Sequence, residues 1–230
     1  MSDAAAALRE RRPLLPQAVV ELGPVIDRIM ACVASHTGTA LVLSDLPAAD
    51  SYRHEHDIQV CALGLLLGRE LFSRSGWEDE RGRHRFDGVD QRLHDLGMGL
   101  LLHDIGKVGV PAGILNKPST LTAAETELVR HHPQDGARLL DDAYSPLARA
   151  VVLEHHERWD GTGYPSGRAG RAIHQLARVA AVADVYDSVT SERSYQRARS
   201  PRLGYDVIVQ GAGTAFDPEV VAAFRRLVHP

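Results

Sequence analysis

Leu96-Gly97-Met98-Gly99-Leu100-Leu101-Leu102-His103-Asp104-Ile105-Gly106-Lys107 is the stretch around which we expect the fold to be organised. Its apolar half predicts a buried helix that delivers a histidine, a carboxylate and a lysine into one pocket. Because neighbouring side chains on a helix diverge by about 100°, His103 and Asp104 cannot hold one ion symmetrically. They can serve two adjacent ions with the carboxylate bridging them. The alternative is an ordinary helix end, where His103 and Lys107 are favourable.

The composition limits the class of protein. With 230 residues, 44% of them apolar and 24% charged, the chain is typical of a globular protein with one large domain. Its formal charge of −4 argues against a binder of duplex nucleic acid, which needs a broad basic face. No apolar run is long enough to span a membrane, and two cysteines are too few for a disulfide framework. We therefore expect a cytoplasmic protein without a membrane span.

The hydrophobic pattern predicts an all-α fold, because no alternating strand pattern of convincing length occurs. Residues 17–35 have helical spacing and are expected either to pack on the domain or to form a homodimer. The charged residues 76–90 are expected to form an exposed loop. We divide the chain into an N-terminal tail and helix of unknown role, 1–49, and a main helical domain, 50–230.

Histidine and aspartate side chains recur in or at the ends of the apolar segments of the main domain. This pattern is expected when several helices of a bundle each donate one or two inward ligands. The candidate ligands are His56, His103, Asp104, His132, His155, His156 and Asp184. They are enough for two divalent ions. Because the donors are nitrogen and carboxylate without thiolate, iron or manganese is expected ahead of zinc.

A pair of divalent ions suits the hydrolysis of a phosphodiester. Two ions about 4 Å apart activate water at neutral pH and stabilise the attacking and leaving oxygens of an in-line displacement. The candidate ligand set therefore predicts phosphate chemistry.

Two longer motifs carry a resemblance to a known family. The segments from His103 to Lys107 and from His155 to Pro165 resemble the two signatures of the HD-GYP family, within the HD phosphohydrolase superfamily. Further matches follow in order along about residues 50–228. They are Asp50-x-Tyr52-x-x-x-His56, Leu115-x-Lys117-Pro118, His132-Pro133-x-x-Gly136, Asp184-Val185-Tyr186-Asp187 and Phe216-Asp217-Pro218.

The resemblance implies a fold, a metal centre and a reaction. The fold is an HD-domain helical bundle, here with an additional N-terminal helical segment. The reaction is hydrolysis of cyclic di-GMP to the linear dinucleotide pGpG, to GMP or to both, in bacterial second-messenger signalling. All seven candidates are implied as metal ligands, with Asp104 bridging and with Asp104 and Lys107 as catalytic residues. Tyr52 stands where three-metal members carry a glutamate, so two ions are expected.

The resemblance also implies contacts with substrate and partners. Lys107 and Arg193 would hold phosphate oxygens. The loop Gly163-Tyr164-Pro165 would wall the guanine pocket and contact diguanylate cyclase domains. Two alternatives stay open: a phosphodiesterase for another cyclic dinucleotide, or a weakly active or inactive module that binds a cyclic dinucleotide or a cyclase partner. Ser194 and Gln196 depart from the family pattern and leave room for the second alternative.

Overall fold

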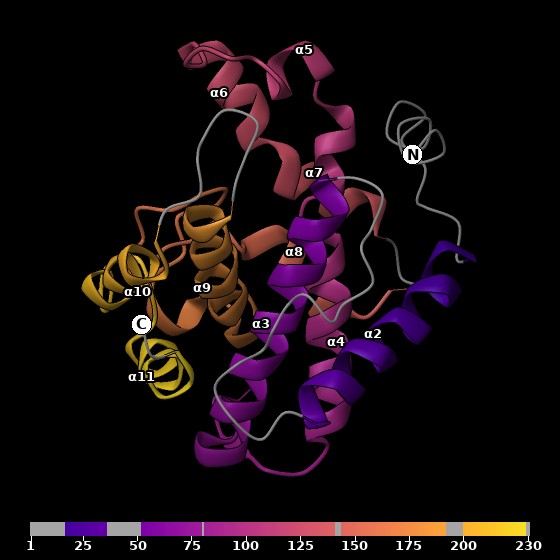
Figure 1. Cartoon of the computed structure of the whole chain (residues 1–230), viewed down its shortest axis with the longest axis vertical. Coiled ribbons are helices and arrows are strands. Elements are labelled where there is room, and N and C mark those ends of the chain that lie inside the picture. The colour runs from indigo at the N-terminus through magenta and orange to yellow at the C-terminus, as the bar shows by residue number, and fades with distance from the viewer. Residues whose placement is uncertain (1–16, 36–51, 80, 141–143, 192–199, 229–230) are drawn as a thin grey trace.

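The computed structural model describes residues 17–35, 52–79, 81–140, 144–191 and 200–228. Within these ranges the chain is a bundle of helices (Figure 1), so the predicted all-α class is confirmed. The elements in chain order are α2 (Gln17–Ser35), α3 (Tyr52–Ser75), β1 (Trp77–Glu78), β2 (His84–Arg85), α4 (Val89–Leu102), η2 (Ile105–Gly109), α5 (Ala112–Leu115), α6 (Ala123–Arg130), α7 (His132–Leu139), α8 (Pro146–Glu154), η3 (Gly170–Ala172), α9 (Gln175–Thr190), α10 (Pro201–Gln210) and α11 (Pro218–Leu227).

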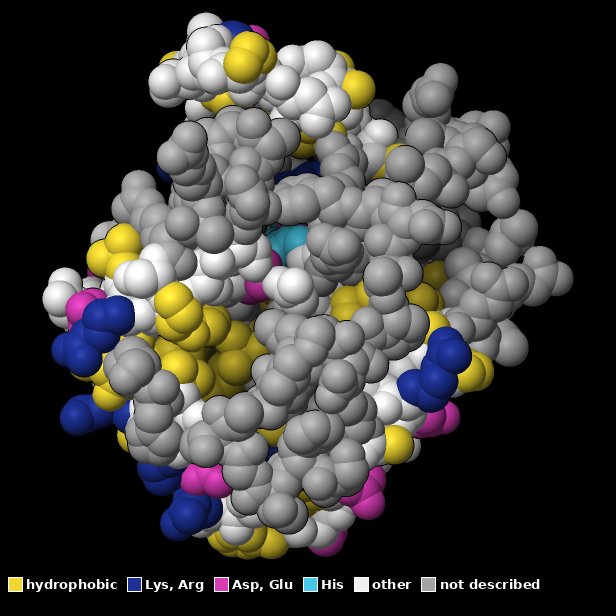
Figure 2. Space-filling view, viewed as in Figure 1, with side chains coloured by type: hydrophobic (Ala, Val, Ile, Leu, Met, Phe, Trp, Pro, Cys, Tyr) yellow, Lys and Arg dark blue, Asp and Glu magenta, His cyan; other side chains and the backbone are white. Residues whose placement is uncertain are grey.

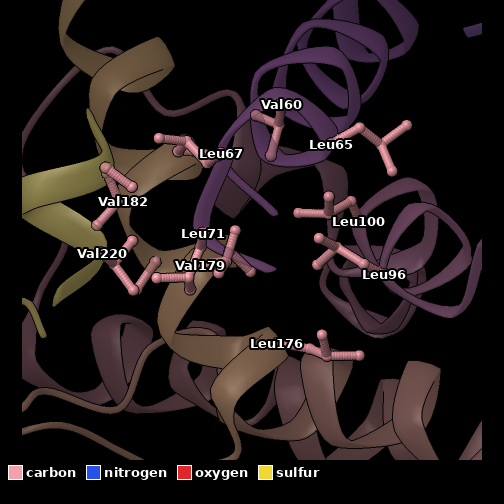
Figure 3. Close-up of a cluster of buried hydrophobic side chains, with 14 of the residues drawn as sticks. Val60, Leu65, Leu67, Leu71, Leu96, Leu100, Leu176, Val179, Val182 and Val220 are labelled. Atoms are coloured by element: carbon pink, nitrogen blue, oxygen red, sulfur yellow. The ribbon is translucent and has the colours of Figure 1, made fainter. Parts of the chain in front are cut away.

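Helix α3 lies at the centre of the bundle because it is apolar on several faces. Val60, Leu67 and Phe72 are fully buried. Helices α4, α9 and α11 pack around α3, and Figure 3 shows their leucine and valine side chains gathered against it. Helices α5 and α6 project from the end of the bundle that is uppermost in Figure 1.

Glycines on α3 allow α4 to approach it closely. A Cβ atom at Gly64 would lie 2.4 Å from Cδ1 of Leu100, and one at Gly68 would lie 2.7 Å from Cδ2 of Leu96. Glycine weakens an isolated helix, but here it makes room for the two leucines. The approach brings the end of α4, and with it His103, towards the centre of the bundle.

The N-terminal helix α2 packs on the main bundle, which was one of its two predicted roles. Ile26 and Ile29 are buried, and Ile26 shares a hydrophobic cluster with Met98 of α4 and Leu139 of α7. The predicted boundary between residues 49 and 50 falls in 36–51, outside the described residues. The division into two units stays a prediction, as does the homodimer.

A short hairpin corrects the expectation of a plain loop at residues 76–90. Strands β1 and β2 pair antiparallel, with Trp77 opposite Arg85. Gly76 and Gly82 adopt positive φ angles of 76° and 70°, a conformation that favours glycine. Strands of two residues carry too little alternation to be recognised in a sequence.

Arg178 of α9 attaches this hairpin to the bundle. Its guanidinium is buried, donates a hydrogen bond at 2.5 Å to Asp217, which caps α11, and donates another to Glu78 of β1. It also donates to the carbonyl of Ile173 at 3.0 Å. One buried cation therefore joins the hairpin and helices α9 and α11.

We expect Arg178→Met to lower the free energy of unfolding by about 3–5 kcal/mol, because it leaves two buried carboxylates without their cation. Denaturation by urea measures the change. The matched control is Arg202→Met, which removes an exposed pair with Asp206 at 3.2 Å and is expected to cost at most about 1 kcal/mol. Equal losses in the two variants would show that the buried cation does not join the elements.

Candidate metal centre

The structure brings all seven predicted ligands together from five parts of the bundle. They form two groups, in each of which the donor atoms lie within 4.8 Å of one another. One group is Asp104, His132, His155 and His156, and the other is His56, His103 and Asp184. Side chains separated by more than a hundred residues thus converge on one place, as the sequence pattern predicted. The role of each side chain as a ligand remains a proposal.

Three of the histidines are anchored in the same way. Nδ1 of His103 lies 2.7 Å from the carbonyl oxygen of Leu100, and the same contact recurs for His132 with Val129 at 2.8 Å and for His155 with Val152 at 2.9 Å. Because a carbonyl only accepts hydrogen bonds, Nδ1 carries the proton in each ring. The hydrogen bond to the backbone therefore leaves the Nε2 atom of each ring turned towards the centre.

The Nε2 atoms of these rings lie close together at the centre. Nε2 of His132 lies 3.3 Å from Nε2 of His155. Nε2 of His103 and Oδ1 of Asp104 are buried, and among the described residues neither has a hydrogen-bond partner. Buried polar atoms normally find partners, and atoms that can only accept are satisfied by a cation. The donor set therefore fits divalent metal ions.

Asp104 lies between the two groups. Its Oδ1 is 3.2 Å from Nε2 of His132 and 3.9 Å from Nε2 of His155, whereas its Oδ2 is 3.7 Å from Nε2 of His103. Each oxygen therefore faces a different group. Burial by itself would raise the pKa of Asp104, but Lys107 and the neighbouring histidines lower it well below its ordinary value. A carboxylate that stays ionised between two ligand groups suits the predicted bridging role.

His56 joins the second group through two aspartates of α9. Its Nδ1 is 2.5 Å from Oδ2 of Asp187, and its Nε2 is 3.4 Å from Oδ1 of Asp184. Burial would lower the pKa of His56, but the two carboxylates together raise it to about 10. The surroundings of this ring thus favour a positive charge, which either a proton or a metal ion supplies. Asp187 is placed to orient the ring, as carboxylates commonly do behind ligand histidines.

The paired histidines 155 and 156 are held neutral. Burial, and then the neighbouring imidazoles, lower the pKa of His155 well below its ordinary value. Burial also lowers the pKa of His156 to about 4. Since a ligand imidazole must be unprotonated, both rings are ready to bind metal at neutral pH.

The predicted substrate loop reaches the centre through Tyr164. Its ring stacks on His156 with the centroids 4.7 Å apart, and its backbone N–H donates to the carbonyl of His156 at 3.2 Å. A Cβ atom at Gly163 would lie 2.3 Å from the backbone nitrogen of Arg158. Glycine is therefore required where the loop turns back, and Pro165 follows Tyr164 through a cis peptide bond.

Glu157 has a role that the sequence did not indicate. It is buried, and its carboxylate accepts hydrogen bonds from the backbone N–H groups of Ser166 at 2.7 Å and Arg168 at 3.1 Å. From its position in the sequence alone, Glu157 could stand at an exposed helix end or form a hydrogen bond with a candidate ligand histidine. The hydrogen bonds instead hold the far side of the loop, a contact that spacing along the chain cannot reveal.

Two basic side chains were predicted to contact phosphate, and a further acidic side chain lies at the centre. Lys107 pairs with Oδ2 of Asp104, which places its charge at the centre as predicted. Arg193 lies outside the described residues. Asp57 was not singled out: its Oδ1 lies 4.0 Å from Nδ1 of His103, and burial raises its pKa to about 6. The His-Asp pair at positions 56 and 57 was the only signal for it in the sequence.

Two glycines set the distance between η2 and α7, and so between Asp104 and His132. A Cβ atom at Gly106 would lie 2.0 Å from the carbonyl oxygen of His132 and 2.5 Å from the backbone nitrogen of Gly136. Both glycines belong to the sequence motifs. Figure 2 shows a histidine side chain at the floor of a hollow in this region, with an acidic side chain beside it.

The protein-family model of the HD domain matches residues 85–220. Because the match covers more than half of the chain, the chain belongs to the HD domain family. Proteins with this domain bind divalent metals, in agreement with the clusters described above.

Two similar proteins are named as phosphodiesterases of cyclic dinucleotides. The chain is 42% identical over 206 residues to a protein of Pseudomonas aeruginosa named cyclic di-GMP phosphodiesterase PA4108, which covers 89% of this chain and 46% of that protein. It is 37% identical over 217 residues to a Vibrio cholerae protein named 3'3'-cGAMP-specific phosphodiesterase 3, covering 94% of this chain and 42% of that protein. The chain therefore spans about half the length of these relatives.

A solved structure supports the fold. Bd1817, an HDG"Y"P protein from Bdellovibrio bacteriovorus, matches with a TM-score of 0.68 at 16% identity, over 97% of this chain and 67% of that one. The predicted resemblance to the HD-GYP family is confirmed by the family match and the relatives together. None of the described helices combines the length and the apolar character that crossing a membrane requires.

We expect Gly106→Ala to lower both stability and affinity for divalent metal, because the added methyl group pushes α7 and His132 away from Asp104. Overpacking of this kind typically costs about 1–3 kcal/mol. Denaturant unfolding and titration with Mn²⁺ measure the two effects. Gly113→Ala is the control, since a Cβ atom there would meet nothing within 4 Å. Unchanged metal affinity in Gly106→Ala would contradict the proposed spacing role.

Proposed function

We propose that the chain is a metal-dependent phosphodiesterase that hydrolyses cyclic di-GMP to the linear dinucleotide pGpG, to GMP or to both. The observation that carries the proposal is the pair of candidate ligand groups with Asp104 between them, in which buried nitrogen and carboxylate atoms gather at one place. The relatives named cyclic di-GMP phosphodiesterases support the substrate. The relative named for 3'3'-cGAMP keeps another cyclic dinucleotide as the alternative substrate.

The proposed cofactor is two divalent ions, iron or manganese. Imidazole and carboxylate donors without thiolate suit these metals. One group offers His56, His103 and Asp184, the other His132, His155 and His156, and Asp104 would bridge them. When bound, such ions polarise the phosphodiester and lower the pKa of an attacking water.

The side chains of the chain would then orient and hold the substrate. Lys107, now paired with Asp104, is placed to hold a phosphate oxygen, and Arg193 is proposed for a second contact. The Gly163-Tyr164-Pro165 loop would form one wall of the pocket. Hydrolysis adds a hydroxyl group to phosphorus, breaks the bond to the 3′ oxygen and returns a proton to that oxygen. Each bond that is cut consumes one water.

Other predictions also belong to this proposal. The loop would contact diguanylate cyclase domains, residues 50–230 would form the phosphodiesterase domain, and the protein would act in the cytoplasm. The motifs support the first two of these predictions, and the low cysteine content supports the third.

We expect protein purified without oxygen and supplied with Mn²⁺ or Fe²⁺ to hydrolyse cyclic di-GMP while holding about two ions per chain. Asp104→Ala is expected to lower the rate about a thousandfold or more, since it removes the ligand shared by both ions. Chromatography of the products and metal analysis measure the two quantities. Protein that binds two ions and the dinucleotide without cutting it would favour a binding module, and parallel assays with 3'3'-cGAMP would identify the alternative substrate.

We expect Asp187→Asn to weaken divalent metal binding about 10–100-fold, because the amide no longer fixes the ring of His56 as a carboxylate does. Competition with a chromophoric chelator measures the affinity. Asp206→Asn, an exposed change on α10, is the control and should match the unaltered protein. Equal affinities in both variants would show that Asp187 does not orient the ligand.

A further inference from the structure

Arg130 forms a column with two aromatic rings that ends at the proposed metal centre. The carbon of its guanidinium lies 5.2 Å from the centroid of the Tyr164 ring, and that ring stacks on His156. Arg130 is the last residue of α6, and His132 begins α7 two residues later. Its backbone is therefore attached closely to a candidate ligand, while its side chain is exposed.

Arg130 differs from the other cations around the site in having no acidic partner among the described residues. Five other basic side chains between residues 107 and 168 pair with a carboxylate: Lys107 with Asp104, Lys117 with Glu125, Arg138 with Asp135, Arg158 with Asp160 and Arg168 with Glu154. The contact recorded for the guanidinium of Arg130 is the tyrosine ring.

A guanidinium held by an aromatic ring can still bind an anion. The attraction acts between the positive charge and the face of the ring and needs no acceptor atom. A guanidinium carries several N–H donors, and two of them form a fork that matches two oxygens of a phosphate. The contact with Tyr164 therefore leaves donors of Arg130 for a phosphate.

The substrate proposed above carries two phosphates, of which the metal ions can take up only one. The other lies across the ring of the dinucleotide and needs cations of the protein, because burying an unpaired charge is costly. In addition to the phosphate contact proposed above for Arg193, we propose that Arg130 binds this second phosphate and so favours cyclic dinucleotides over diesters with a single phosphate. The proposal rests on the proposed function and adds a residue to it.

The test compares Arg130→Gln with Arg138→Gln in metal-loaded protein. Arg138 is an exposed arginine on the next helix whose partner is Asp135, so its replacement makes the same change in charge. We measure kcat/KM for cyclic di-GMP and for bis(4-nitrophenyl) phosphate, a diester with one phosphate. Calorimetry gives the Kd of cyclic di-GMP independently of turnover.

In Arg130→Gln we expect the ratio of kcat/KM for cyclic di-GMP to that for the single-phosphate diester to fall about tenfold, and the Kd to rise by a similar factor. Arg138→Gln should keep the ratio and the Kd of the unaltered protein. An unchanged ratio and Kd would overturn the proposal. Equal losses on both substrates would also overturn it, because Arg130 would then act only by holding Tyr164 against His156.

The same measurements separate the proposal from the function on which it rests. A protein that cuts neither substrate but binds cyclic di-GMP about tenfold more weakly as Arg130→Gln would refute the phosphodiesterase and support the role of Arg130. A protein that cuts cyclic di-GMP equally well with and without Arg130 would do the reverse.

Discussion

Buried imidazole nitrogens gathered around Asp104 are the constraint on which the site depends. In His103, His132 and His155 the Nδ1 atom is hydrogen-bonded to a backbone carbonyl oxygen. The Nε2 atom of each ring therefore faces the centre. Turning one of these rings away from the centre would break its hydrogen bond to the backbone. The fold therefore keeps these nitrogen atoms close together, and a bound cation would stabilise the arrangement.

The bundle achieves this by placing ligands where helices end. The last carbonyl groups of a helix lack partners inside the helix. His103 and His155 stand at the C-caps of α4 and α8, and each gives its Nδ1 proton to a carbonyl in the last turn. His132 does the same for the end of α6, through Val129. The same hydrogen bond thus satisfies a carbonyl group at the end of the helix and places the proton on Nδ1, which leaves Nε2 as the atom that would bind metal.

The sequence predicted the helical class and all seven residues of the two groups, because motif order and spacing carry both. It could not predict how Glu157 is used, since the two N–H groups that it binds become its neighbours only when the loop folds back. Asp57 was hidden for a similar reason: its nearest partner in the site, His103, comes from another helix. The hairpin depends on Arg178, a hundred residues further along the chain. Long-range contacts of this kind leave no periodic signal.

The polar networks around Arg178 and around Asp104 differ in whether the chain itself supplies the balancing charge. Around Arg178, this cation and Arg171 offset the carboxylates of Glu78 and Asp217, although Oε1 of Glu78 has no hydrogen-bond partner among the described residues. Around Asp104, Nε2 of His103 and Oδ1 of Asp104 have no hydrogen-bond partner among the described residues, which is costly for buried polar atoms. An ion that binds only the folded arrangement would offset that cost, and it would stabilise the fold more strongly the higher its affinity. Metal binding and folding would therefore be coupled, and the glycines that set the position of His132 would serve both.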